Sequence, residues 1–331
     1  MGLHSSEILA LNKKAERYAQ TVSAIRSEVE KVIVGQKDAV TKVLLALLSD
    51  GHVLLEGVPG LAKTLLVRAL SSTIQAEFVR IQFTPDLLPA DIIGTKIYEH
   101  KTSSFKTVKG PVFSNFVLAD EINRAPPKVQ SALLEAMQEK QVTIQGETHK
   151  LKQPFMVLAT QNPIESEGTY ALPEAQVDRF MFKVLLDYPS KEEEAEILER
   201  YTKLSQPEAG KITNASKIVE MQNFVRSIYA DEKILEYVST IIDATRNPEE
   251  YGLKINGFIE YGASPRASIW AIIGAKANAL LNGRGYVLPE DVKSVIHEVL
   301  RHRIILSYEA EAEGITTDEI IDQIMSKIRV P

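Results

Sequence analysis

The chain alternates short apolar runs with longer segments in which apolar residues recur at helical spacing. Five runs have the length and composition of buried strands, and they lie near residues 52–56, 77–82, 115–120, 155–161 and 180–185. Helical patterns separate these runs, and two more precede the first strand, at residues 13–32 and 37–49. Strands that alternate with helices predict an α/β fold with a parallel sheet.

Beyond residue 190 the pattern changes, because helical segments follow one another with no clear strand among them. The helix expected at residues 191–204 leads away from the sheet, and Pro189 marks the hinge side. We therefore expect an α/β core with its leading helix over residues 1–188 and an all-helical domain over residues 189–331.

A glycine-containing loop follows the first strand, and it has the form of a phosphate-binding loop. Its sequence is Gly57-Val58-Pro59-Gly60-Leu61-Ala62-Lys63-Thr64-Leu65. Gly57 and Gly60 let the backbone turn its N–H groups inward, Lys63 can reach the β- and γ-phosphates, and the Thr64 hydroxyl can bind Mg²⁺. The helix that begins near Ala62 directs its positive end at the anion.

Ala62 departs from the usual form of this loop, which has glycine before the lysine. A methyl group is tolerable there if the residue already has a helical, negative φ.

Two carboxylates end the third strand, at Asp120 and Glu121. Adjacent strand residues point to opposite sides, so the two acids are expected to have different roles. Asp120 suits the Mg²⁺ shell, usually through water, and Glu121 would polarise an attacking water. The alternative is a merely polar strand end.

The strand at residues 155–161 places Asn162 at the same edge, where ligands bind in open α/β sheets. Its amide can hydrogen-bond the γ-phosphate or the water that Glu121 orients. An asparagine before Pro163 is also a common turn former, which is the alternative for this residue.

With these motifs in place, the chain resembles the AAA+ ATPases, and more narrowly their MoxR family. The segments that carry the likeness are the phosphate loop, Leu118-Ala119-Asp120-Glu121-Ile122-Asn123-Arg124-Ala125-Pro126-Pro127-Lys128, Ala132-Leu133-Leu134-Glu135-Ala136-Met137-Gln138-Glu139, Ala159-Thr160-Gln161-Asn162-Pro163, Leu172-Pro173-Glu174-Ala175-Gln176-Val177-Asp178-Arg179-Phe180, Gly262-Ala263-Ser264-Pro265-Arg266 and Arg301-His302-Arg303. The resemblance covers nearly the whole chain from about Val34. It implies strand order 5-1-4-3-2 and a helical lid after the sheet domain.

The resemblance also implies a role for each matching residue. Val34 and Gly35 match the segment that packs on adenine, Lys63 matches the phosphate lysine, and Thr64 and Asp120 match the magnesium residues. Glu121 matches the catalytic base, and Asn162 matches the sensor asparagine. Arg179 matches the arginine finger that reaches the next subunit's nucleotide, and Arg266 matches the second sensor. The implied cofactors are ATP and Mg²⁺.

The arginines have a physical rationale, since a planar, permanent cation stabilises the charge that spreads over a transferring phosphoryl group. Each also has an alternative. Arg179 can form a local ion pair with Asp178, and Arg124 is a rival finger on a loop just past the acids. Arg266 follows a predicted helix start at Pro265 and can be a solvated first-turn residue.

The composition of the chain excludes or disfavours several classes of function. The 331 residues carry 38 basic and 44 acidic side chains, a net charge of −6 that gives no general attraction for nucleic acid. The chain has no cysteine, which excludes disulfides and thiol chemistry, and its six histidines lack metal-ligand spacing. His52 and His297 are expected to be structural. Residues 1–18 lack the continuous apolar stretch of a signal peptide, and no run reaches the ~18 apolar residues of a membrane span.

Two segments are longer than a plain connection between two elements requires. Each is a candidate for the part of the protein that transmits mechanical movement. Residues 84–113 match the place where this AAA+ branch inserts a segment facing the ring's centre. Residues 141–151, in which Val142 and Ile144 alternate with polar residues, match its β-hairpin. Passive surface embellishment is the alternative for both.

The resulting hypothesis is a cytoplasmic, Mg²⁺-dependent ATPase. The resemblance implies a homo-oligomer, in the form of a hexameric ring, that remodels client proteins with a separate von Willebrand factor A-domain protein as partner. A magnesium-chelatase-like motor subunit and a non-catalytic nucleotide-sensing scaffold remain alternatives. A helicase is less favoured, because neither charge nor basic-aromatic interleaving supports tracking on nucleic acid.

Overall fold

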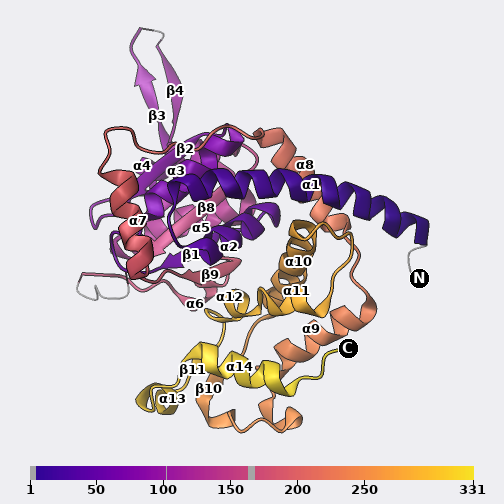
Figure 1. Cartoon of the computed structure of the whole chain (residues 1–331). Coiled ribbons are helices and arrows are strands. Elements are labelled where there is room, and N and C mark those ends of the chain that lie inside the picture. Colours follow the sequence, from indigo (N-terminus) through magenta and orange to yellow (C-terminus); the bar gives the residue numbers. More distant parts are fainter. Residues whose placement is uncertain (1–4, 102, 163–167) are drawn as a thin grey trace. The chain divides into compact units, whose positions relative to one another are not determined.

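The structure is a computed structural model that describes residues 5–101, 103–162 and 168–331. The chain divides into two compact units, which are coloured by sequence in Figure 1. The sheet unit comprises Ala24–Phe180 and Val184–Glu220. The C-terminal unit comprises Met221–Pro331 together with the residues up to Ser23 and the short piece Met181–Lys183.

A five-stranded sheet forms the centre of the sheet unit. Its strands are β1 (Val53–Glu56), β2 (Phe78–Gln82), β5 (Phe116–Asp120), β8 (Met156–Gln161) and β9 (Phe182–Leu185). They lie in the order β2-β5-β8-β1-β9. Numbered as the five core strands, this is the expected order 5-1-4-3-2. The five predicted strands are also confirmed, with identical carboxyl ends.

The three inner strands explain why polar chemistry gathers at one edge. In β1, β5 and β8 every residue is buried except the last, which is Glu56, Asp120 and Gln161 respectively. The parallel register pairs Glu56 with Gln161 and Gln82 of β2 with Asp120, so these strand ends lie along the same edge. Apolar strands thus hold the sheet in the core and present polar groups only where they stop.

Helices cover the sheet. They are α1 (Ser5–Val32), α2 (Lys37–Leu48), α3 (Lys63–Ile74), α4 (Pro89–Ile93), α5 (Pro127–Glu139), α6 (Glu174–Val177) and α7 (Lys191–Tyr201). The first residues of α1 belong to the C-terminal unit. We expected α7 to lead away from the sheet, but it stays in the sheet unit. The reason is that Arg200 and Tyr201 donate hydrogen bonds to the unpaired carbonyls at the end of α1, those of Lys31 and Val32 among them.

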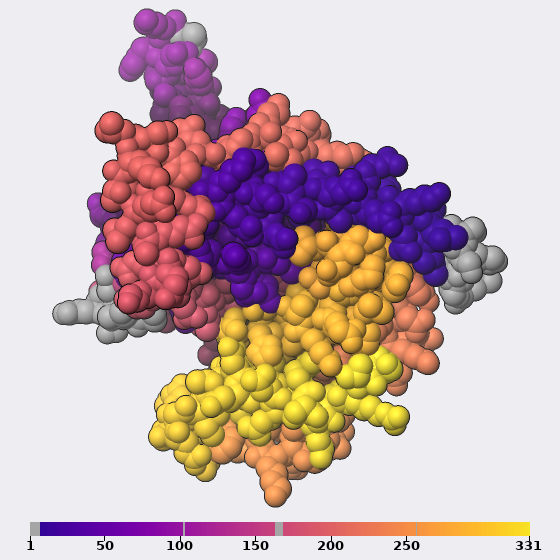
Figure 2. Space-filling view, in the orientation of Figure 1, coloured from indigo at the N-terminus to yellow at the C-terminus, as the bar shows by residue number. Residues whose placement is uncertain are grey.

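Both predicted insertions fold as antiparallel hairpins. Within residues 84–113 the strands β3 (Gly94–Glu99) and β4 (Ser104–Lys109) pair with each other and project from the rest of the sheet unit, as Figures 1 and 2 show. The single-turn 3₁₀ helices η1 (Pro111–Phe113) and η2 (Ile122–Arg124) stand before and after β5. The hairpin expected at residues 141–151 is confirmed as β6 (Gln141–Ile144) and β7 (Glu147–Lys150).

The C-terminal unit is mainly helical. Its helices are α9 (Glu232–Ala244), α10 (Pro265–Leu281), α11 (Pro289–Lys293), α12 (Ile296–Leu300), α13 (Tyr308–Ala312) and α14 (Thr317–Lys327). The 3₁₀ helices η3 (Pro248–Tyr251) and η4 (Asn256–Phe258) lie between α9 and α10 in the sequence. Helix α8 (Ala215–Ser227) begins in the sheet unit and ends in the C-terminal unit. The expectation of no strand was wrong in one detail, because β10 (Ile259–Tyr261) and β11 (Ile305–Leu306) form a short antiparallel pair.

Buried ion pairs and hydrogen bonds fix the C-terminal unit. Asp291, which is 1% exposed, receives two hydrogen bonds from the Arg284 guanidinium, at 2.7 and 2.8 Å. Arg301 pairs with Asp318, and the buried Arg303 donates to the Met181 carbonyl at 3.2 Å. These arginines therefore have structural partners in their own unit. Among the described residues, no helix is both long and apolar enough to cross a bilayer.

Candidate functional site

A cavity of about 400 Å³ opens at the carboxyl edge of the sheet, where the predicted motifs meet. Its lining residues are Pro59, Gly60, Leu61, Ala62, Lys63, Thr64, Leu65, Arg80, Asp120, Glu121, Thr160 and Asn162. The phosphate loop, both acids and the asparagine of the third motif therefore share one cavity, although up to a hundred residues separate them in sequence.

The two loop glycines meet different requirements. Gly60 has φ +90°, a left-handed conformation that favours glycine. Gly57 is needed for close approach instead, because a Cβ there would lie 2.8 Å from the Leu186 carbonyl oxygen. Its N–H group donates to the Gln161 carbonyl at 3.4 Å. The N–H group of Gly57 itself therefore belongs to the sheet edge.

Ala62 does not meet the condition of a negative φ. It lies at the start of α3 with φ +54° and ψ +22°, in the left-handed region. The loop must make this turn to bring α3 in behind it, which explains why the usual form of the loop has glycine here. The methyl group is accommodated at a cost in backbone strain of about 1 kcal/mol.

Lys63 is held at the mouth of the loop. Its ammonium donates to the Gly57 carbonyl at 2.5 Å, and this bond closes the loop on itself. Burial lowers the pKa of Lys63, while the negative charges of Asp120, Glu121 and Glu56 act in the opposite direction. The lysine charge therefore faces the acids across the cavity.

Both oxygens of Asp120 are engaged. The Thr160 hydroxyl donates to Oδ1 at 2.6 Å, and Thr160 in turn accepts from the Glu121 N–H at 2.8 Å. Oδ2 accepts two hydrogen bonds from the Arg80 guanidinium, at 2.9 Å from Nε and 2.6 Å from Nη2. The carboxylate is thereby held in one orientation from two neighbouring strands.

Glu121 has a different local geometry from the one expected. We expected it to point away from Asp120 as the next residue of a strand, but β5 ends at Asp120 and Glu121 has φ +56°. This left-handed turn places both acids in the lining of one cavity. Its Oε2 atom accepts from Gln82 Nε2 at 2.8 Å and lies 3.2 Å from Arg124 Nε.

Three residues of this arrangement were not predicted, namely Arg80, Gln82 and Thr160. Arg80 and Gln82 alternate with apolar residues along β2, and Nη2 of Arg80 donates to Oε1 of Gln82 at 2.7 Å. That alternation was visible in the sequence, and it places both side chains on one face of the strand beside β5. Thr160 stands at the end of β8, within a segment already recognised as a motif.

Asn162 lines the cavity and is only 8% exposed, so its amide lies at a buried strand end. Pro163, on which its alternative as a turn former depends, lies outside the described residues. The sensor assignment of Asn162 stays a prediction with suitable placement.

Other predicted residues do not line the cavity. Val34 is buried beside Gly35, which has φ +68° and packs against the Glu193 carboxylate at the start of α7. Arg179 follows α6 in the sheet unit. Its side chain has no hydrogen bond or ion pair within the described part of the chain, so the alternative pair with Asp178 is absent.

Arg266 belongs to the C-terminal unit, at the second position of α10. Pro265 begins this helix and Ser264 precedes it, as predicted. The role of Arg266 as second sensor stays a prediction.

The donor set fits magnesium. Mg²⁺ usually keeps several waters and takes one or two carboxylates together with substrate phosphates. The cavity offers the hydroxyls of Thr64 and Thr160, the second of which already donates to Asp120, and the carboxylates of Asp120 and Glu121. No group of three or more histidines and carboxylates suited to an all-protein metal cage occurs among the described residues. Thr64 and Asp120 are therefore suited to hold a metal that arrives with a phosphate ligand.

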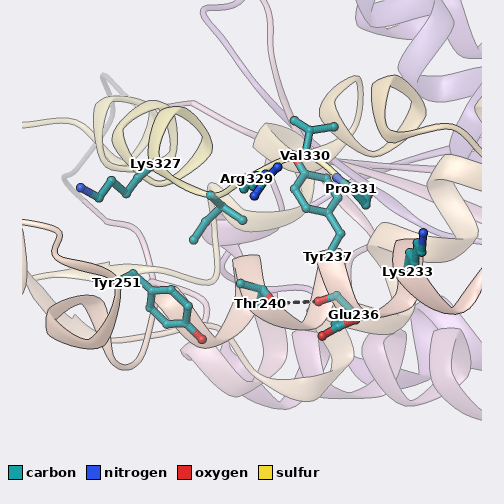
Figure 3. Close-up of a pocket in the computed structure, with 10 residues that line it drawn as sticks. Lys233, Glu236, Tyr237, Thr240, Tyr251, Lys327, Arg329, Val330 and Pro331 are labelled. Atoms are coloured by element: carbon teal, nitrogen blue, oxygen red, sulfur yellow. Dashed lines mark hydrogen bonds between the residues drawn. The ribbon is translucent and has the colours of Figure 1, made fainter.

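A larger cavity, of about 540 Å³, lies in the C-terminal unit between α9 and the last residues of the chain (Figure 3). Tyr237 and Tyr251 contribute to its lining together with Lys233, Lys327 and Arg329. None of the motif residues belongs to it, and the Thr240 hydroxyl donates to the Glu236 carbonyl of its own helix at 2.8 Å. Size alone therefore does not identify the functional site, and we assign it to the smaller cavity, where the chemistry converges.

The chain is similar to known proteins over most of its length. Residues 52–182 match the ATPase family associated with various cellular activities (AAA), and residues 255–324 match an AAA lid domain. Chaperone MoxR1 of Mycobacterium tuberculosis is 49% identical over 92% of this chain and 81% of its own length. The uncharacterized protein YeaC of Bacillus subtilis is 47% identical over 92% of each chain.

Among solved structures, a crystal structure from Cytophaga hutchinsonii, whose assignment as an ATPase is provisional, superposes with a TM-score of 0.92. It is 51% identical and covers 98% of this chain and 99% of its own. The parallel sheet, the helical lid and these relatives agree over nearly the whole length. The chain belongs to the MoxR family of AAA+ ATPases.

Proposed function

We propose that this protein hydrolyses Mg²⁺-ATP at the carboxyl edge of its sheet and uses the energy to remodel other proteins. The observation that carries the proposal is that a phosphate loop with its lysine and two carboxylates line one cavity of about 400 Å³. Loop, cation and acids are the parts that phosphoryl transfer to water requires, because its catalysis is mostly positioning and charge neutralisation.

The phosphate chain would lie against the loop and the start of α3, where backbone N–H groups and Lys63 supply positive charge. Thr64 and Asp120 would hold Mg²⁺, whose charge neutralises the phosphate oxygens when it is bound. Lys63 would exchange its present bond to the Gly57 carbonyl for a phosphate oxygen.

Glu121 would act as the base that orients and polarises the attacking water. Gln82 and Arg124 both bond its Oε2 atom, whereas its Oε1 atom has no partner among the described residues. One oxygen therefore fixes the carboxylate and the other is available to a water. Asn162 would hold that water or the γ-phosphate from the neighbouring strand.

Assembly would complete the site. Arg179 is partly exposed and lies outside the cavity lining, and its side chain has no partner in the described part of its own chain, which suits a residue offered to another subunit. Arg266 would approach the nucleotide from the lid, and Val34 with Gly35 would contact the adenine. Arg124, which pairs with Glu121 of its own chain, is better explained as a local partner.

We further propose a ring of identical subunits, in the form of a hexamer, that acts in the cytoplasm. MoxR1, the relative from Mycobacterium tuberculosis, is described as a chaperone, which supports a chaperone-like role in the assembly or maturation of protein complexes. A separate von Willebrand factor A-domain protein would be the partner. The β3–β4 hairpin, which projects from the sheet unit, would face the ring's centre.

The test is to measure the ATPase rate per subunit against protein concentration, with Lys63→Ala as the inactive control. We expect the rate per subunit to rise with concentration until the ring is complete. A rate that stays constant under conditions in which the protein is monomeric would contradict the role of Arg179 in trans. Absence of hydrolysis at every concentration would contradict the proposed activity itself.

A further inference from the structure

Arg80 forms the strongest contact in the site that no sequence motif assigns. It stands on β2, the strand at the edge of the sheet, and it lines the cavity together with the phosphate loop. Its guanidinium donates twice to one oxygen of Asp120, from Nε at 2.9 Å and from Nη2 at 2.6 Å. The residue proposed to serve the metal is thus already neutralised by a cation from its own chain.

This contact occupies much of the acceptor capacity of the carboxylate. A carboxylate offers about four lone-pair sites, two on each oxygen. The Thr160 hydroxyl takes one site on Oδ1, and the two N–H groups of Arg80 take both sites on Oδ2. Three of the four sites are therefore filled, and only one, on Oδ1, is available to a metal or to a water bound to it.

The two partners of Asp120 differ in how readily they can leave. Thr160 is 1% exposed and is fixed by the N–H group of Glu121. The Arg80 side chain is 49% exposed, so water can replace its hydrogen bonds as it moves away. Arg80 is therefore the exchangeable partner and Thr160 the permanent one.

A second cation at the same carboxylate disfavours the first, because the two positive charges repel each other and compete for the same lone pairs. We propose that Arg80 is a positioning residue that occupies Asp120 in the metal-free site and is displaced when Mg²⁺ enters. It thereby raises the Mg²⁺ concentration at which the nucleotide site fills. This inference rests on the proposed function, since it concerns the same nucleotide site.

The test measures binding rather than turnover. A fluorescent, non-hydrolysable ATP analogue is held at a fixed concentration while Mg²⁺ is titrated into wild-type protein, Arg80→Ala and Arg80→Lys. The reported quantity is the Mg²⁺ concentration that gives half of the metal-dependent increase in binding. Arg68→Ala is the matched control, because it removes an exposed arginine from nearby α3 that has no acidic partner among the described residues.

We expect Arg80→Ala to lower the half-saturating Mg²⁺ concentration by about two- to fivefold, as suits the loss of a half-exposed ion pair. Arg80→Lys should fall between Arg80→Ala and wild type, because lysine keeps the charge without the two parallel bonds. The Arg68→Ala control should match wild type. Thermal melting of each variant confirms that it is folded.

An unchanged half-saturating concentration in Arg80→Ala would overturn the inference. A raised one would overturn it as well, because Arg80 would then orient Asp120 for the metal rather than compete with it. In both cases the wild-type protein still binds the nucleotide with Mg²⁺, so the proposed function survives. If the wild-type protein shows no Mg²⁺-dependent binding, the proposed function fails instead.

Discussion

The polar side chains at the two ends of the central strands differ in their exposure and in the partners of their hydrogen bonds. At the amino edge, His52 and Asn115 are 5% and 7% exposed, and their hydrogen bonds go to backbone groups. His52 accepts from the Val157 N–H at 3.0 Å and contacts the Met137 carbonyl at 3.2 Å, and Asn115 donates to the Pro154 carbonyl at 3.0 Å.

At the carboxyl edge, the carboxylates of Asp120 and Glu121 bond to other side chains instead. Arg80, Gln82 and Arg124 hold the two acids, and the side chains of Arg80 and Arg124 are 49% and 42% exposed. Buried groups bonded to the backbone are costly to disturb, whereas exposed pairs of side chains can exchange partners at little cost. The difference therefore separates polar residues that build the sheet from polar residues that can take part in chemistry.

The largest effect is expected at the carboxyl edge, from Glu121→Gln. Loss of the base should lower the turnover number for ATP by about 10²- to 10⁴-fold, while nucleotide binding is retained because the charge contacts to phosphate stay in place. Steady-state hydrolysis and binding of a fluorescent nucleotide measure the two properties separately. Glu135→Gln on the exposed side of α5 is the control and should hydrolyse ATP normally. Normal turnover in Glu121→Gln would remove Glu121 from the role of base.

The next effect concerns the amino edge and appears in the pH dependence of stability. Burial lowers the pKa of His52 from its usual 6.5 to about 4 in the folded protein. The unfolded chain therefore binds the extra proton first as the pH falls. Stability should be complete above about pH 6.5 and should decrease by about 3 kcal/mol on acidification to about pH 4.

Urea denaturation of the wild-type protein and of His52→Gln between pH 4 and 7 measures this contribution. The variant should be less stable at pH 7, because a buried hydrogen-bonding group is altered, but its stability should depend less on pH. Equal slopes for the two proteins would show that His52 is not the titrating group.

The smallest effect is expected in the phosphate loop, from Ala62→Gly. Glycine removes the strain of the left-handed φ, and part of that gain is offset by the greater freedom of the unfolded chain. The expected gain in the free energy of unfolding is less than about 1 kcal/mol. Ala69→Gly, inside α3, is the control and should destabilise by about 1 kcal/mol or more, because a helical φ gives glycine no advantage. A lower free energy of unfolding in Ala62→Gly would contradict the conclusion that the backbone of Ala62 is strained.

Much of the fold could be predicted from periodicity. The five sheet strands end at the residues expected. Four of them stop at a polar residue, Glu56, Gln82, Asp120 or Gln161, whereas β9 stops at Leu185. The strand order came from the resemblance to AAA+ ATPases rather than from the pattern itself. Local signals were less informative for residues 84–113, where the length of the segment was evident but its folding into the β3–β4 hairpin was not.

The residues of the candidate site could likewise be predicted only in part. Lys63, Thr64, Asp120, Glu121 and Asn162 were predicted from contiguous motifs, and the structure brings them to one cavity. Arg80 and Gln82 were missed because their importance depends on the pairing of β2 with β5, which is a tertiary contact. The positive φ angles of Ala62 and Glu121 could not be predicted from the sequence either. The positive φ of a non-glycine residue follows from the path of the surrounding chain and not from the preference of that residue.

The most direct test of the proposed nucleotide site shared between subunits mixes two inactive proteins. Arg179→Ala alone should lose about 10³-fold in hydrolysis, and Glu121→Gln alone should be similarly inactive. In a mixed assembly, some sites combine the intact Glu121 of one subunit with the intact Arg179 of its neighbour. A parallel mixture of Arg124→Ala with Glu121→Gln tests the rival arginine.

We predict that equal amounts of Arg179→Ala and Glu121→Gln regain a substantial fraction of wild-type ATPase activity when mixed and allowed to assemble, and that the mixture with Arg124→Ala gains nothing beyond the activities of its components. Activity no greater than the sum of the separate variants in the Arg179→Ala mixture would contradict a nucleotide site completed by a neighbouring subunit.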